Sequence, residues 1–274
     1  MEIYILMNLE NIDISGKINS VNMDISVAYF AHLDSSWRCK NVCSSFTRMY
    51  IPTDGEGILQ SGDEIIPLVK GKIYIIPAMH IFSYKCNEKL DKLFFHFSLV
   101  GEDKLDLFSK VKKILILDDT EGYAERISHL FMQNTANSVV ALKSLLLTLV
   151  NSAIKENNIF LGKTSNYSPT TKKALEYIEK NLRVTLTIDE IAKAIFVSRL
   201  ALQNNFKRDL NKTIGKYIDD RVLIEGEKLL SENKLSIKEI SDRLHFCDQF
   251  YFSRKFSEGY GISPQKHRKN IVLR

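Results

Sequence analysis

The stretch that decides the fold runs Leu186-Thr187-Ile188-Asp189-Glu190-Ile191-Ala192, and its pattern returns 49 residues later as Leu235-Ser236-Ile237-Lys238-Glu239-Ile240-Ser241. In each copy a threonine or serine stands three positions before a glutamate, which is the spacing of a capping box at a helix N-terminus. The isoleucines behind each cap recur at helical spacing and mark one apolar face. Each copy therefore predicts a short helix.

A second, longer helix is predicted after each short one, beyond a tight turn. Ser198 and Asp248 are of the residue types that cap helix N-termini. Asn211 and Gly261 end the two helices, because asparagine and glycine best accept the left-handed conformation found there. Ser263-Pro264 then starts a further helix with a cap and a first-turn proline. The chain thus carries the pattern of a helix-turn-helix twice.

The two longer helices have outward faces suited to reading DNA. On a helical wheel the inward positions are Ala201, Leu202, Asn205, Phe206, Tyr251, Phe252 and Phe256. The outward positions, which we predict to contact DNA, are Arg199, Leu200, Gln203, Asn204, Lys207, Gln249, Phe250, Ser253 and Arg254. Asparagine and glutamine can bond adenine edges, arginine can bond guanine, and apolar side chains can touch the thymine methyl. Since any surface helix has a polar outer face, this prediction depends on the pattern occurring twice.

Residues 170–270 resemble the DNA-binding domain of the AraC family of bacterial transcription regulators. The most specific stretch runs from Phe246 to Phe256 and continues through Gly261-Ile262-Ser263-Pro264 to Arg268. The resemblance implies two helix-turn-helix units joined by a long helix, here from about Thr213 to Ser231. Such a helix would hold both reading helices in major grooves about one turn, or roughly 34 Å, apart. Carried over by position, the family's base contacts fall on Leu200, Gln203, Asn204, Gln249, Phe250, Ser253 and Arg254.

The chain departs from the family pattern at a few positions. His245 and Asn211 stand where the family usually has glycine, and asparagine is a tolerable substitute in a left-handed position. Val222 and Gly226 stand in the linking helix where the family often has arginine and alanine. Glycine is expected to loosen that helix by up to about 1 kcal/mol relative to alanine. These departures concern local rigidity and leave the family resemblance intact.

Charge and composition agree with a two-domain DNA-binding protein. The chain has 274 residues and a net charge of +5. Residues 165–274 contain 21 lysines and arginines against 14 aspartates and glutamates, a net charge of +7, whereas residues 1–164 have a net charge of −2. Positive charge concentrated on one domain is what phosphate binding requires, although it is also common on solvated surfaces. The length is sufficient for two compact domains with their own cores.

The sequence lacks the usual signals for secretion, membranes or metal binding. The apolar run at residues 3–7 is too short for a secretory signal, and no run of 18 apolar residues is present, so we expect a cytoplasmic protein without a membrane segment. The four cysteines have no zinc spacing and are read as reduced thiols. A redox sensor built on Cys39 and Cys43 is the alternative. We expect neither a metal nor a cofactor.

The N-terminal part predicts a small all-β domain. Short apolar or alternating runs are separated by turn residues, a pattern typical of a sandwich or barrel. The predicted strands are residues 20–30, 45–51, 57–59, 64–69, 72–76, 81–84 and 92–99. Pro52-Thr53-Asp54-Gly55 is read as a turn between two of them. The runs at residues 71–80 and 94–97 resemble the cupin-like barrel of AraC-family sensor domains.

A barrel of this size can enclose one small ligand, and the resemblance implies a sugar or other metabolite. Aromatic faces stack on sugar rings, and polar groups orient hydroxyls. The candidate lining residues are Trp37, Arg48, Tyr50, His80, Tyr84 and His96. Each is also a common kind of structural residue, because a tryptophan can be core and a lone histidine can be satisfied within a sheet. Catalysis is not expected, since the barrel region has no His-x-His pair and the chain has no nucleophile elbow or P-loop.

Two amphipathic segments, residues 120–134 and 138–156, predict helices between the domains. In the family such helices pack on the barrel and often pair two subunits; packing within one subunit is the alternative. We therefore predict a cupin-like ligand-sensing barrel at 1–118, a helical dimerisation and interdomain segment at 119–159, a linker at 160–168 and an AraC-type DNA-binding domain at 169–274. A helix over 169–181 would open the last domain.

The sequence therefore predicts a regulator that binds double-stranded DNA, acts as a homodimer and activator, and responds to a small-molecule effector. A contact with RNA polymerase is a further expectation. Three other interpretations remain open at this point: a constitutive regulator without a ligand, a binding module whose second domain serves protein contacts, and a cupin-type enzyme with a fused helical domain.

Overall fold

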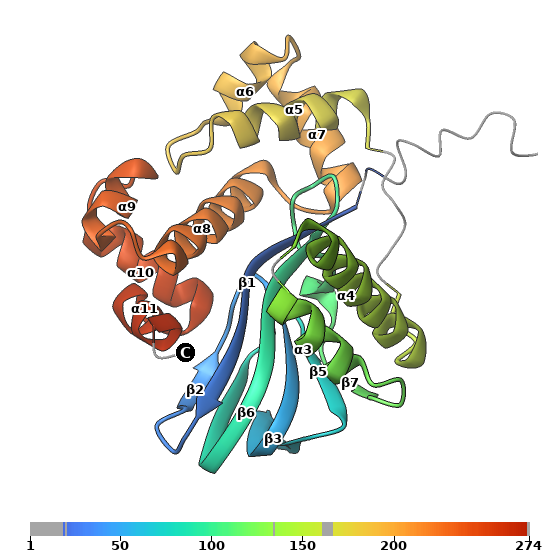
Figure 1. The fold of residues 1–274 in the computed structure, drawn as a ribbon. Coiled ribbons are helices and arrows are strands. Elements are labelled where there is room, and N and C mark those ends of the chain that lie inside the picture. The colour runs from blue at the N-terminus through green and yellow to red at the C-terminus, as the bar shows by residue number, and fades with distance from the viewer. Residues whose placement is uncertain (1–18, 20, 134, 161–166, 273–274) are drawn as a thin grey trace, which may run out of the picture.

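The computed structural model describes residues 19, 21–133, 135–160 and 167–272, with the side chains of 270–272 left out. The apolar run at residues 3–7 and most of the predicted linker at 160–168 lie outside the described residues. An antiparallel sheet comes first, two helices pack on it, and a helical domain with two helix-turn-helix units follows (Figure 1). This arrangement confirms the predicted fold class.

The sheet has seven strands, and the order along its main path is β1-β6-β3-β5-β7, with β2 paired to β6 and β4 paired to β3. All of these pairings are antiparallel. The strands are β1 (Asn22–Leu33), β2 (Arg38–Val42), β3 (Thr47–Ser61), β4 (Glu64–Val69), β5 (Lys72–Ile76), β6 (Phe82–Val100) and β7 (Leu115–Asp118). The sequence patterns located β4 and β5 correctly but missed the short strands β2 and β7.

The predicted turn at residues 52–55 is wrong, because β3 continues through it. The register against β6 shifts between Pro52 and Asp54 and again between Gly55 and Gly57, so the strand bends at bulges and does not end. Gly55 has φ +71°, and a Cβ there would lie 2.2 Å from the carbonyl oxygen of Lys89. Only glycine permits this approach. The opposite strand β6 likewise runs unbroken where two strands were predicted.

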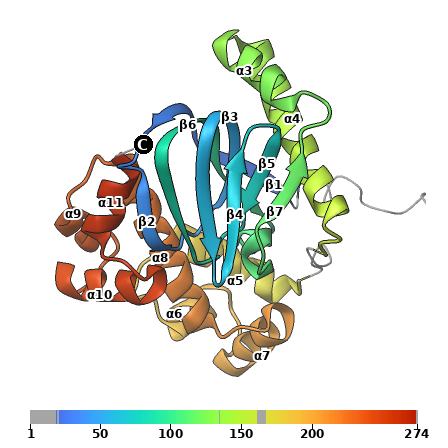
Figure 2. The ribbon, with the colours of Figure 1, turned by 90° about the horizontal axis from the view of Figure 1, so that it is seen from below.

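The sheet has an apolar core on each face. On one face, alternate side chains of β3 and β6, such as Met49, Phe95 and Phe97, pack with α3 (Tyr123–Gln133) and α4 (Ala136–Glu156). On the other face, side chains from β1 through β6 meet in one cluster because the sheet curls around it. We call this second cluster the inner core. Helices α3 and α4 lie on one side of the sheet. Three helices near the end of the chain, α9 (Ile237–Arg243), α10 (Gln249–Tyr260) and α11 (Pro264–Val272), lie on the other side, next to β2 (Figure 2).

Helix α4 is the one described segment that is long and apolar enough to cross a membrane by length and composition. We expected no membrane segment because the sequence has no run of 18 apolar residues, yet α4 meets the length and composition criteria. It is weak evidence, because a helix that packs on a soluble domain passes the same test. Leu146, Leu149 and Ala153 of α4 are in fact buried against the sheet.

A buried carboxyl lies where the sheet meets the short 3-10 helix η1 (Leu107–Lys110). Asp106 accepts hydrogen bonds from the backbone N–H of Phe108 at 2.8 Å and of Leu99 at 3.3 Å, and from the Thr47 hydroxyl at 3.2 Å. Burial raises the pKa of Asp106 to about 7, because desolvation of the charged form outweighs these hydrogen bonds.

The helical domain has a single core that includes both helix-turn-helix units. Its helices are α5 (Pro169–Lys180), α6 (Ile188–Ala194), α7 (Arg199–Leu210), α8 (Ile214–Glu232), α9 (Ile237–Arg243), α10 (Gln249–Tyr260) and α11 (Pro264–Val272). Leu202 and Phe206 of α7 share one hydrophobic cluster with Phe252 and Phe256 of α10. Helix α8 runs between the two helix groups (Figure 1), and its 19 residues span roughly 28 Å at about 1.5 Å each.

Candidate nucleic-acid interface

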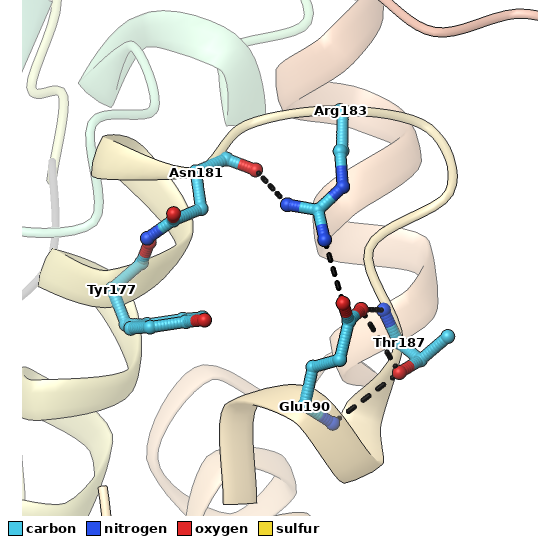
Figure 3. Close-up of polar contacts among 5 residues, drawn as sticks. All are labelled: Tyr177, Asn181, Arg183, Thr187 and Glu190. Atoms are coloured by element: carbon cyan, nitrogen blue, oxygen red, sulfur yellow. Dashed lines mark hydrogen bonds and ion pairs between the residues drawn. The ribbon is translucent and has the colours of Figure 1, made fainter. Parts of the chain in front are cut away.

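The first helix-turn-helix is formed by α6 and α7, and its start is fixed by polar contacts. The Thr187 hydroxyl accepts from the backbone N–H of Glu190, whose carboxylate accepts from the Thr187 N–H at 2.9 Å (Figure 3). Arg183 donates to this carboxylate at 2.6 Å and to the carbonyl oxygen of Asn181, the C-cap of α5, at 3.2 Å. The predicted capping box is therefore present and is tied to the preceding helix.

The second helix-turn-helix, α9 and α10, repeats this local structure. Ser236 and Glu239 form the same reciprocal capping box. The Asp248 carboxylate accepts from the backbone N–H groups of Phe250 and Tyr251 at 2.8 and 2.7 Å, which confirms it as the N-cap of α10. Gly261 ends α10 in the left-handed conformation, as Asn211 ends α7.

The turns inside the two units have the same geometry despite their different sequences. Phe196 and His245 both adopt the left-handed conformation, with φ +57° and +59°. In each unit the next N–H, that of Val197 or Phe246, bonds back to the carbonyl oxygen five residues earlier, at 3.0 Å in both. These bonds form a Schellman motif on a residue that is not glycine. The Phe196 side chain is 94% exposed, so no packing compensates its backbone strain.

Most of the predicted DNA-contacting residues face solvent. On α7 the side chains of Arg199, Leu200, Gln203, Asn204 and Lys207 are all exposed. On α10 Phe250 and Arg254 are exposed, whereas Gln249 and Ser253 are half-buried. Among the predicted inward positions Ala201 is exposed and Asn205 and Tyr251 are half-buried, so the buried stripe is narrower than the wheel predicted.

Several of these side chains have contacts within the protein that bear on their availability. Arg199 forms an ion pair with Asp189 of α6 at 2.7 Å. The Ser253 hydroxyl donates to the carbonyl oxygen of Gln249 at 2.7 Å, so its proton is already engaged. Arg254 lies over the ring of Tyr251, 5.2 Å from its centroid, which orients the guanidinium at the helix surface.

Helix α8 joins both units to the sheet domain through a buried carboxylate. Glu227 is 1% exposed and accepts from the Ser45 N–H at 2.8 Å and from the Ser45 hydroxyl. Its other oxygen lies 3.1 Å from Nε2 of His267 on α11. Burial alone would raise the pKa of Glu227, but the contacts with His267 and Ser45 outweigh it and lower the pKa. Sequence reasoning could not predict this pairing, because Ser45 and Glu227 are 182 positions apart.

A second set of contacts links the loop after β6 to α8. The Tyr217 hydroxyl donates to the carbonyl oxygen of Asp103 at 2.9 Å. Arg221 donates to the carbonyl oxygen of Lys104 at 3.2 Å and forms a two-pronged ion pair with Glu179, at 2.7 and 2.8 Å. Together with Glu227, these contacts hold α8 against the sheet domain at two points along its length.

The sheet domain brings five of the six predicted ligand-lining residues into one connected group. Trp37 stacks on Tyr84 with ring centroids 4.3 Å apart and meets Tyr50 edge-on at 6.2 Å. Arg48 donates to the Tyr50 hydroxyl at 3.5 Å and contacts His96 at 3.4 Å. His80 instead shares a hydrogen bond with Ser61 at 2.9 Å, and burial lowers its pKa.

Sequence reasoning missed Lys92, which also lies in this group. It is 3% exposed, and its Nζ lies 3.3 Å from the centroid of the Tyr50 ring and 4.2 Å from that of Trp37. A lysine in an alternating strand is normally predicted to face solvent. Lys92 is two and four residues from Phe94 and His96, so the three side chains lie on the same face of β6, and only this spacing could have suggested that Lys92 is buried.

Three cysteines, Cys39, Cys43 and Cys86, are buried, and Cys247 is exposed. Burial and the charge of Glu227 raise the pKa of Cys43 to about 11, despite the opposing charge of Arg48. Because the reactive form of cysteine is the thiolate, this argues against a redox sensor at Cys43.

These features define a protein with two capped helix-turn-helix units on one core, held against a β-sheet domain, which is a class of DNA-binding transcription regulator. The helix-turn-helix domain family matches residues 191–270. The Msm operon regulatory protein of Streptococcus mutans is 24% identical over 282 residues, covering 97% of this chain and 99% of its own length. The lactose operon transcription activator of Staphylococcus xylosus is 20% identical over 235 residues, covering 82% and 84%. Both relatives are named as regulators.

Among solved structures, ToxT from Vibrio cholerae O395 superimposes with a TM-score of 0.56 at 13% identity, over 93% of this chain and 99% of that one. This likeness shows a shared two-domain fold. The family match and the named relatives support the resemblance to AraC-family transcription regulators that the sequence shows.

Proposed function

We propose that α7 and α10 read DNA sequence in successive major grooves, through Arg199, Leu200, Gln203, Asn204, Lys207, Gln249, Phe250, Ser253 and Arg254. The observation that supports the proposal is that α7 and α10 pack on one shared core and each exposes an outward face. Phe206 and Phe256 are fully buried, whereas Gln203 and Arg254 are exposed. The roughly 28 Å length of α8 suits the spacing of neighbouring grooves.

Arg254 provides the sharpest test of base reading. An operator selected from random DNA would be mutated one base pair at a time, and the affinities of wild-type and Arg254→Ala protein would be compared. We expect Arg254→Ala to lose discrimination at one base pair, by roughly 1–3 kcal/mol. Lys255→Ala on the same helix is the matched control and should preserve the sequence preference. An equal loss on all sequences would assign Arg254 to phosphate contact.

A salt titration tests whether the helical domain binds DNA through phosphates at all. The logarithm of the affinity should fall linearly with the logarithm of the salt concentration, with a slope that reflects several neutralised phosphates. A flat response would favour a module whose helical domain binds proteins.

We propose further that a small molecule, such as a sugar, binds in the inner core of the sheet domain and alters DNA binding. The support for a ligand here comes from the chemistry of the buried side chains. Arg48 is 1% exposed and has no carboxylate partner among the described residues, so its guanidinium can donate to a ligand oxygen. The stacked rings of Trp37 and Tyr84 supply aromatic surface beside it.

Coupling between effector and DNA is the measurement that tests this second proposal. Calorimetric titration against a panel of metabolites would be carried out with and without operator DNA. An effector should bind with different affinity in the two conditions, because linkage is reciprocal. Binders that show no coupling, or an absence of binders, would favour a constitutive regulator.

We propose that the protein acts as a homodimer in the cytoplasm, with the sheet domain ending near residue 118, the helices at 119–159 pairing two subunits, and the DNA-binding domain starting at residue 169. Val139, Val140 and Leu147 of α4 are 58%, 71% and 42% exposed, which leaves an apolar stripe on this helix. Val140→Glu should therefore shift sedimentation towards the monomer, and an unchanged dimer would place the subunit contact elsewhere.

A further inference from the structure

The helical domain exposes its large apolar side chains where the reading helices begin. Among the side chains of α5 to α11 that the structure describes, the large apolar ones left exposed are Phe196, Leu200 and Phe250, at 94%, 66% and 76%. Phe196 lies in the turn that leads into α7, and the other two lie in the first turns of α7 and α10. Single exposed apolar residues are common, whereas a set confined to equivalent places indicates a contact surface.

Leu200 and Phe250 occupy the same position in the two units. Each is the second residue of its helix, two positions after an N-cap, which is Ser198 for α7 and Asp248 for α10. In helix-turn-helix proteins the N-terminal residues of the reading helix are the ones that contact base edges. Both reading helices therefore present an apolar side chain where a base edge would lie.

The start of α10 is unsuited to binding phosphate. Helix N-termini bind phosphate through free backbone N–H groups. Here the N–H groups of Phe250 and Tyr251 both donate to the Asp248 carboxylate, at 2.8 and 2.7 Å. The hydrogen bond from Tyr251 is the largest cause that lowers the pKa of Asp248, so this carboxylate is charged at neutral pH and repels a DNA phosphate. A base edge is therefore the better neighbour for this end of α10.

The thymine methyl is the one group on the major-groove edges that suits an apolar side chain. The other groups donate or accept hydrogen bonds, and covering one with leucine or phenylalanine would leave it without a partner. The polar residues of α7 agree with an A·T-rich site. Gln203 and Asn204 are exposed one turn after Leu200 on the same face, and both side chain types suit adenine.

We propose that Leu200 and Phe250 each contact the methyl group of a thymine, at two operator positions about ten base pairs apart. The assignment rests on the proposed function, which places α7 and α10 in successive major grooves. It adds what the operator must contain, namely an A·T pair opposite the start of each reading helix. The two units then recognise the same chemical group, as their equivalent positions require.

Replacing thymine by uracil tests this assignment directly, because deoxyuridine lacks only the methyl group and keeps the base pair. An operator selected from random DNA with the full chain would have each thymine replaced in turn, and the affinity of each duplex would be measured. We expect replacement at two positions, about ten base pairs apart, to weaken binding by about fourfold each, the equivalent of burying one methyl group. An operator that tolerates uracil at every position would overturn the proposal.

Two variants assign each methyl group to a side chain. Leu200→Ala should abolish the uracil effect at one position and leave the other, and Phe250→Ala should do the reverse. Both side chains are largely exposed, so their truncation leaves the core of the domain intact. Ile65→Ala removes a 68% exposed apolar side chain from β4 and is the matched control, which should keep both uracil effects. Uracil effects that persist in both reading-helix variants would overturn the assignment.

The same experiment separates this inference from the proposed function. A selection that returns no preferred sequence would refute sequence reading by α7 and α10, and the methyl contacts with it. A preferred sequence in which Arg254→Ala relaxes one base pair, but uracil has no effect, would refute the methyl contacts alone. The exposed apolar ends of the two helices would then be assigned to a protein partner.

Discussion

Gly226 provides a demanding test of how α8 packs, because two physical effects of opposite sign meet there. A Cβ at this position would lie 2.9 Å from Cε2 of Phe252 and 3.3 Å from Cδ1 of Leu244. Phe252 is completely buried and Leu244 is 2% exposed, so neither side chain can swing into solvent. The glycine therefore permits close approach of α8 to the second helix-turn-helix, a role that the sequence did not reveal.

The expected change in the free energy of unfolding for Gly226→Ala is the difference between two effects. Alanine in a helix interior is favoured over glycine by about 1 kcal/mol. Forcing an extra methyl group into a packed core costs typically about 1–3 kcal/mol. We therefore expect Gly226→Ala to destabilise the protein by about 1 kcal/mol, a fall in melting temperature of about 2–4 °C for a protein of this size.

Gly215 of the same helix is the matched control, since a Cβ there would meet nothing within 4 Å. Gly215→Ala should be neutral or stabilising by up to about 1 kcal/mol. The assay is urea denaturation of both variants, with a double-mutant cycle between Gly226→Ala and Phe252→Leu to detect unfavourable coupling between the two sites. If Gly226→Ala raised the stability as much as Gly215→Ala, the close-approach argument would be refuted.

Three further predictions concern stability. His267→Ala should cost about 3 kcal/mol because it leaves the buried Glu227 carboxylate without one partner, and adding Glu227→Gln should recover part of the loss in urea denaturation; equal losses would contradict the pairing. Since the folded pKa of Asp106 is raised from 3.8 to about 7, this group lowers stability as pH rises from about 4 to 7, so Asp106→Asn should gain on the wild type between pH 5 and pH 8, by at most about 3 kcal/mol; parallel pH curves would argue against it. Phe196→Gly should stabilise the protein by roughly 1 kcal/mol because it relieves a left-handed phenylalanine whose ring is exposed, and an unchanged thermal midpoint would show that the strain is absent.

The helical domain could be predicted well because its determinants are local. Thr187 with Glu190 and Ser236 with Glu239 specify helix starts within four residues, and the structure contains both capping boxes. The turns were harder to predict, since Phe196 and His245 adopt the left-handed conformation without being glycine. Their conformation follows from the Schellman hydrogen bonds, which depend on the helix already being formed.

The sheet was predicted less completely because its limits depend on distant pairing. Residues 52–55 have turn composition, yet pairing with β6 on both sides makes them a bend within one strand. The short strand β2 exists only because β6 extends far enough to pair with it. The six candidate ligand residues were placed inside the sheet domain by pattern alone, but the buried position of Lys92 required the observed register.

The position of Cys43 has a consequence for how the protein unfolds. This residue of the sheet domain is a member of the hydrophobic cluster that fills the helical domain, and Leu105 packs against the same cluster. The two domains therefore complete each other's interior, so heat should melt them in a single cooperative step. A helical-domain fragment that starts after residue 168 would lack Cys43 and Leu105 and would therefore have a cavity in its core. Its DNA affinity would then measure how far this loosened core affects α7 and α10.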